Sequence, residues 1–86
     1  MPKIFVLRGY TISFYSDDHL PVHVHAIGND GYLIRDYPGV TRECEGMKQG
    51  DRRAVEEWID AHWDIIIFQW NEFFKSNPEN LFVVEV

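Results

Sequence analysis

The amino-acid sequence predicts an α+β fold, in which an antiparallel sheet of about four to six short strands is packed by two C-terminal helices. Three observations support this prediction. Residues 4–44 contain short apolar runs between turn residues, residues 51–75 carry apolar side chains at helical spacing, and residues 81–86 return to strand character. Strands followed by helices are typical of α+β domains. A chain of 86 residues has the apolar material for one core, so we expect a single domain over residues 1–86.

The first half is predicted to form short strands joined by tight turns. The runs are residues 4–7, 10–15, 22–27, 32–35 and 40–44. Arg8 and Gly9 separate the first two runs, and a two-residue break that contains glycine is typical of a β-hairpin. Because side chains alternate along a strand, Tyr10, Ile12 and Phe14 are expected to share one face.

The second half is predicted to form two helices, or one helix with a bend near residues 61–64. Asp51 is the expected N-cap of the first helix, and Asp64 of the second. The second helix is apolar around nearly its whole circumference, and such a helix must be buried on all sides. Either it is deeply buried in a monomer, or one side meets another chain. We expect the second solution, in the form of a symmetric homodimer. A final strand, residues 81–86, would join this sheet or that of a partner.

Composition limits the classes of partner. The formal net charge of −6 and the pI of about 5.0 argue against a broad nucleic-acid-binding surface, while they permit a basic protein partner. A single cysteine, Cys44, excludes an intrachain disulfide. Residues 1–5 do not have the pattern of a signal peptide, and the apolar run 65–68 is too short to cross a bilayer. We therefore expect a soluble, cytoplasmic protein without a membrane association.

The segment from Phe14 to His25, with the sequence FYSDDHLPVHVH, is the most distinctive part of the chain. It resembles small bacterial proteins of the domain-of-unknown-function family 4160. Their Trp-x-x-Phe-Phe pattern is similar to residues 70–74, although many relatives have a second proline where this chain has Val22. The family has no established activity. The resemblance implies a gene that is one of a pair, in an arrangement like a toxin–antitoxin module.

His19, His23 and His25 form the one cluster with chemical potential. Strand residues two apart face the same way, so His23 and His25 are expected to be neighbours, and His19 could fold back toward them. Three imidazoles are a ligand set for zinc, to which Asp17 or Asp18 could add a carboxylate. The stronger interpretation is a polar strand face that binds no cofactor, with zinc as the alternative. His62 is expected to be a packed core histidine.

A metal-free site is a further possibility. Two adjacent histidines can act as general base and general acid in RNA cleavage, because the imidazole pKa lies near neutrality. Such a site needs a phosphate clamp, for which the candidates are Arg8, Arg35, Arg42, Arg52 and Arg53. Of these, we place Arg35 beside the catalytic pair His23 and His25. Arg52 and Arg53 lie near the start of the first helix, where anions are favoured. The simpler interpretation is that the arginines pair with carboxylates on the surface.

Two hypotheses follow. The leading one is a small protein-interaction module, dimeric, that works in a toxin–antitoxin-like two-gene system and binds the neighbouring gene's product. The alternative is a histidine-based ribonuclease or metal-dependent hydrolase that uses His19, His23 and His25.

Overall fold

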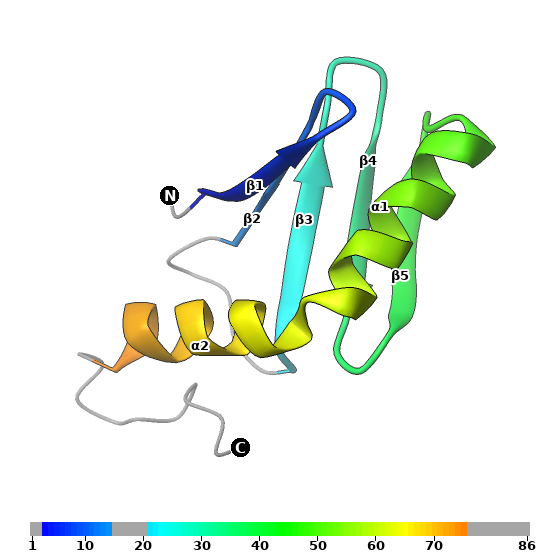
Figure 1. Ribbon diagram of the computed structural model, residues 1–86. Coiled ribbons are helices and arrows are strands. Elements are labelled where there is room, and N and C mark those ends of the chain that lie inside the picture. The colour runs from blue at the N-terminus through cyan, green and yellow to red at the C-terminus, as the bar shows by residue number, and fades with distance from the viewer. Residues whose placement is uncertain (1–2, 15–20, 76–86) are drawn as a thin grey trace.

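A computed structural model describes residues 3–14 and 21–75 of the chain. They form five strands and two helices (Figure 1). The elements are β1 (Lys3–Leu7), β2 (Tyr10–Ser13), β3 (His23–Ile27), β4 (Tyr32–Asp36), β5 (Val40–Glu45), α1 (Gln49–Ala61) and α2 (Trp63–Phe74). The strands form one antiparallel sheet in chain order, β1-β2-β3-β4-β5. The predicted α+β fold is confirmed, while the predicted strand at residues 81–86 lies outside the described residues.

The hairpin of β1 and β2 forms because its two turn residues adopt the left-handed conformation. Arg8 has a φ of 52° and Gly9 a φ of 82°, as in the tight turns that match the twist of paired strands. Tyr10, Ile12 and Phe14 are at most 5% exposed, which confirms that they share the core face of the sheet.

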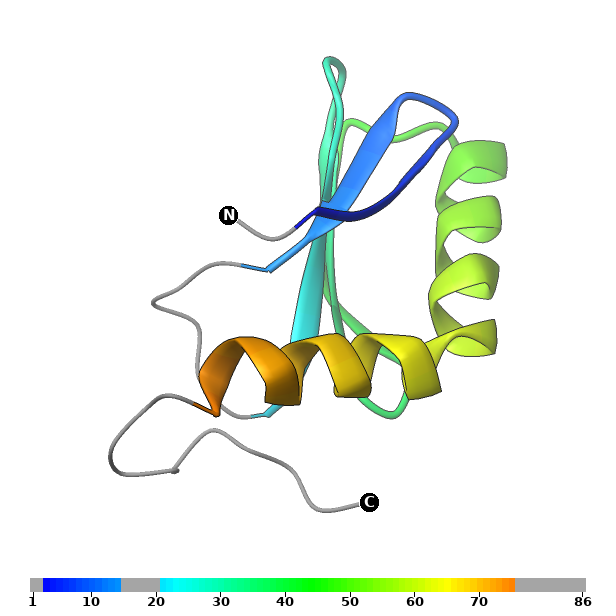
Figure 2. The same ribbon diagram turned by 60° about the vertical axis from the view of Figure 1, so that its left-hand side comes forward.

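The two helices cover different parts of the sheet. α1 lies against one face, and α2 runs nearly perpendicular to α1 across the end of the sheet at which β3 begins (Figures 1 and 2). His62 separates them, because its φ of −128° lies outside the helical range. The prediction of two helices is therefore confirmed. Among the described residues, neither helix has the length and apolar character needed to span a membrane.

Both predicted N-caps are wrong. α1 begins after Lys48 and α2 after His62, so that Asp51 and Asp64 lie in the first turns instead. The reason is that a helix N-terminus attracts carboxylates throughout its first turn and not at the cap alone. The Asp51 carboxylate also receives an ion pair from Arg8 of the β1–β2 turn, at 3.1 Å.

The core lies where the sheet meets both helices. Its fully shielded side chains come from β2, β3, β4, α1 and α2, together with Phe14, which directly follows β2. They include Ile12, Phe14, Val24, Leu33, Val55, Ile59, Ile66 and Trp70. Each large apolar side chain buried in this way contributes about 1.5–3 kcal/mol. Trp70 contacts Phe14 at 5.2 Å between ring centroids and joins α2 to the sheet.

Candidate functional site

His23 and His25 lie side by side on β3, as the alternation along a strand predicts. Their ring centroids are 5.2 Å apart, in an edge-on arrangement. His23 is only 6% exposed, whereas His25 is partly exposed. Val24 and Ala26 point to the other face and are fully buried there.

The environment of His23 fixes its tautomer. Its Nδ1 lies 2.8 Å from the carbonyl oxygen of Pro21, which can only accept a hydrogen bond. Nδ1 therefore carries the proton and donates it, so that in the neutral ring the lone pair lies on Nε2. The ring also packs edge-on against Trp70, with centroids 5.6 Å apart. His23 is thus held in one orientation by β3 and α2 together.

The structure does not bring all the predicted site residues together. His19, Asp17 and Asp18 lie outside the described residues. Within residues 3–14 and 21–75, no group of three or more histidines, cysteines or carboxylates is placed to hold a metal ion. Arg35 pairs with Val24 across β3 and β4, so it shares the helix-facing side of the sheet. The histidines point to the opposite face.

Arg35 instead joins the sheet to α1. Its guanidinium donates two hydrogen bonds to the Asp60 carboxylate, at 2.8 and 2.6 Å, and a third to the Thr41 hydroxyl at 2.7 Å. Glu56 lies 3.4 Å away, and Asp60 also accepts a bond from the Trp63 indole at 3.1 Å. The hydrogen bonds from Arg35 lower the pKa of Asp60, and the same contact raises the pKa of Arg35.

The other described ion pairs support the simpler interpretation of the arginines. Arg42 binds Asp36 across the β4–β5 hairpin at 2.7 Å, and Arg52 binds Glu56 one helical turn away at 3.1 Å. Burial would raise the pKa of Glu56, but hydrogen bonds from Thr41 and Arg52 outweigh it, so the pKa is lowered.

A hollow of about 490 Å³ lies between the end of β5 and the start of α1. It is lined by Cys44, Gly46, Met47, Gln49, Arg52, Arg53 and Glu56. The Glu56 carboxylate neutralises Arg52 inside this hollow. Arg52, one of the two arginines near the start of α1, is therefore already paired with a carboxylate.

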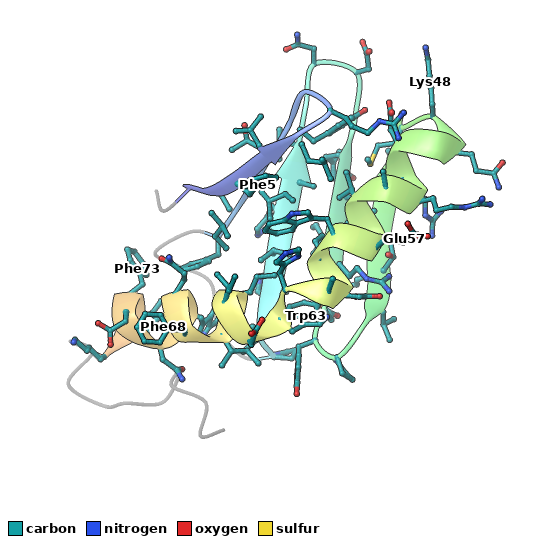
Figure 3. The ribbon with its side chains drawn as sticks, in the orientation of Figure 1. Phe5, Lys48, Glu57, Trp63, Phe68 and Phe73 are labelled. Atoms are coloured by element: carbon teal, nitrogen blue, oxygen red, sulfur yellow. The ribbon has the colours of Figure 1, made fainter. Side chains whose placement is uncertain are left out.

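The largest unexpected feature is an apolar surface to which β1, α1 and α2 all contribute. We call it the aromatic surface and define it as Phe5, Trp58, His62, Ile65, Phe68 and Phe73. Figure 3 shows Phe68 in front of α2, Phe73 above it, and Phe5 on β1 farther above. Phe68 is 64% exposed, Ile65 46%, Phe5 43% and Phe73 37%. Exposed patches of this kind mark interaction sites more often than scattered single apolar residues do.

Stacked rings hold the centre of the aromatic surface. Trp58 stacks on Phe5 with centroids 4.6 Å apart and on His62 at 4.1 Å. His62 Nδ1 donates a hydrogen bond to the Trp58 carbonyl oxygen at 2.6 Å. His62 is half-buried, so its prediction as a core histidine is wrong. It packs at the surface because it lies between the helices and outside the buried stripe of either one.

Sequence reasoning identified the apolar character of the second helix but missed the contribution of β1. The Phe5–Trp58 contact joins residues far apart in the chain, and no local pattern signals it. The signal that was present is the pair of large apolar residues, Ile65 and Phe68, that the sequence places beside Asp64 and Glu72 on the outer side of α2.

Comparisons with known proteins agree with the resemblance carried by the histidine motif. Searches of curated proteins and of solved structures found no match. A family model described as Domain of unknown function (DUF4160) matches residues 9–71, a segment that holds β2 to β5, α1, most of α2 and both described histidines of β3. Since this match spans most of the sequence, the chain belongs to the family of the domain of unknown function DUF4160.

Proposed function

We propose that the protein is an interaction module that binds a partner protein through its aromatic surface. The observation that carries this proposal is the two-sided character of α2. Trp70 and Ile66 on one side are fully buried in the core, whereas Ile65 and Phe68 on the other side are 46% and 64% exposed. Burying a large apolar side chain contributes about 1.5–3 kcal/mol, so covering this side by a partner would be favourable.

Two kinds of partner protein are compatible with binding at the aromatic surface. The family resemblance implies a two-gene, toxin–antitoxin-like module, so the first is the product of the neighbouring gene. The second is another copy of the chain, in the homodimer that the sequence predicts. Either one would cover Ile65 and Phe68 and would extend onto the stacked rings of Phe5 and Trp58.

The test replaces the most exposed anchor and leaves the core intact. Phe68→Ser is expected to abolish co-purification with the neighbouring gene's product and to reduce any dimer to a monomer, as measured by light scattering. Val40→Ser is the matched control, because Val40 is 61% exposed but lies on β5 at the far edge of the sheet. A wild-type protein that is monomeric and captures no partner, or a Phe68→Ser variant that associates like wild type, contradicts the proposal.

A second candidate function is supported by the geometry of β3. The His23 and His25 rings are adjacent, and the bond to Pro21 directs the His23 lone pair to Nε2, as a general base requires. In this role the second imidazole, His25, would act as the general acid in RNA cleavage. His19 would complete a zinc-binding set in the metal-dependent version.

This candidate predicts RNA cleavage, or growth inhibition on expression, that is lost in His23→Ala and in His25→Ala. His62→Ala is the control, since His62 lies between the helices and is not part of the histidine pair on β3. Metal analysis of the purified protein separates the metal-free version from the zinc version. Unchanged activity in both variants would exclude a histidine-based site.

A further inference from the structure

We infer that the aromatic surface accepts a basic, amphipathic helix of another protein rather than a second copy of this chain. The inference rests on the proposed function and identifies the chemistry of the partner. It comes from the arrangement of charge along the exposed side of α2.

Asp64, Phe68 and Glu72 are spaced four residues apart, and all three are exposed. Residues at i, i+4 and i+8 lie above one another on the same side of a helix. With a rise of 1.5 Å per residue, the two carboxylates stand about 12 Å apart along the axis, one on each side of Phe68. We call these three residues the α2 strip. Ile65, three residues before Phe68, lies beside it.

The described basic residues do not neutralise the α2 strip fully. Lys75 binds Glu72 at 3.0 Å, but this pair is exposed at both side chains. Four arginines in the described part of the chain bind carboxylates elsewhere: Arg8 binds Asp51, Arg35 binds Asp60, Arg42 binds Asp36 and Arg52 binds Glu56. Since Lys75 offsets one of its two carboxylates, the α2 strip keeps the negative charge of the other carboxylate, in a chain of net charge −6.

A second copy of the chain fits this strip poorly. A two-fold dimer brings the same patch of both copies together. If the two α2 helices cross antiparallel at Phe68, Asp64 of one copy faces Glu72 of the other. If they run parallel, Asp64 faces its own equivalent. Both arrangements place carboxylates against carboxylates, and like charges across an interface oppose binding.

A helix that carries basic residues on each side of an apolar residue fits the α2 strip well. Two lysines or arginines eight residues apart would meet Asp64 and Glu72. An apolar side chain midway between them would cover Phe68, and one a helical turn away would reach Ile65. The partner would thus pack helix against helix, with apolar anchors at the i, i+3 and i+4 spacing that amphipathic helices use in recognition.

The experiment uses two synthetic helical peptides with the same leucine anchors, one flanked by lysines and the other by glutamates. Binding to the full chain is measured by fluorescence anisotropy. The lysine peptide is expected to bind and the glutamate peptide is not. Asp64→Asn and Glu72→Gln should each weaken binding about two- to fivefold, the range of an exposed charge pair. Glu45→Gln, which removes an exposed carboxylate from β5, should leave binding unchanged.

The second part of the experiment measures peptide binding at different salt concentrations and the mass of the protein in solution. Binding of the lysine peptide should weaken between about 0.05 M and about 0.5 M salt, because salt screens attraction between exposed charges. The inference is overturned if the lysine peptide fails to bind, if both peptides bind alike, or if the wild type forms a Phe68-dependent dimer at low salt. In the last two cases the aromatic surface remains a docking site. If neither peptide binds, no dimer forms and Phe68→Ser changes nothing, the proposed function fails with it.

Discussion

Arg35 shows how one residue type supports two different interpretations. An arginine near a histidine pair is typical of a phosphate clamp, and an arginine facing a helix is typical of an internal ion pair. The Arg35 side chain is only 11% exposed and contacts Asp60 and Glu56 of α1 and Thr41 of β5. Its hydrogen bonds therefore hold the sheet to the first helix.

This contact makes stability depend on pH. Hydrogen bonds from Arg35 hold the pKa of Asp60 below its ordinary value, so the folded protein binds protons at this carboxyl less readily than the unfolded chain does. A lowered carboxyl pKa stabilises the fold above the unfolded pKa of about 4, and this contribution is lost as pH falls through the folded pKa. The lowered pKa of Glu56 acts in the same direction.

Asp60→Asn is therefore expected to lower the free energy of unfolding by about 1 kcal/mol at pH 7 and by much less near pH 3. The figure is small because the Asp60 side chain is 40% exposed and water screens the pair. Urea unfolding followed by tryptophan fluorescence at both pH values measures it, with Glu45→Gln as the control. An equal loss at pH 7 and pH 3 would show that Asp60 acts through packing and not through its charge.

At the scale of the element, local sequence patterns predicted which strands and helices form. They did not predict which other parts of the chain these elements contact. The alternation at Tyr10, Ile12 and Phe14 fixed the buried face of β2, and the same period placed His23 beside His25. The helix starts were missed because a carboxylate in the first turn has the same sequence signal as one at the cap. A hydrogen bond such as that of Arg35 to Asp60 depends on how the chain returns over the sheet, which no local period records.

α2 illustrates the same limit. The sequence showed that α2 is apolar around nearly its whole circumference, but not which side is buried. The side that carries Ile66, Trp70 and Phe74 faces the core, and the side that carries Ile65 and Phe68 does not. This choice was set by the position of the break at His62, which fixes how α2 crosses the end of the sheet.

At the scale of the whole molecule, stability is expected to be marginal. Domains of this size bury a smaller share of the surface that the unfolded chain exposes than larger domains do, and their total stability is of the order of 5–10 kcal/mol. Trp70 is the side chain that connects most of this small core. It is fully buried and packs against Phe14, His23 and Phe74.

The two sides of α2 should therefore separate folding from binding. Trp70→Ala is expected to cost about 3–5 kcal/mol and to leave much of the protein unfolded, whereas Phe68→Ala should change stability by less than about 0.5 kcal/mol. Because Trp70→Ala can fail to fold, Trp70→Phe provides an intermediate step, and urea unfolding followed by circular dichroism measures all three. A Phe68→Ala variant as unstable as Trp70→Ala would mean that Phe68 supports the fold. The loss of partner binding in Phe68→Ser would then report unfolding and not the loss of a docking anchor.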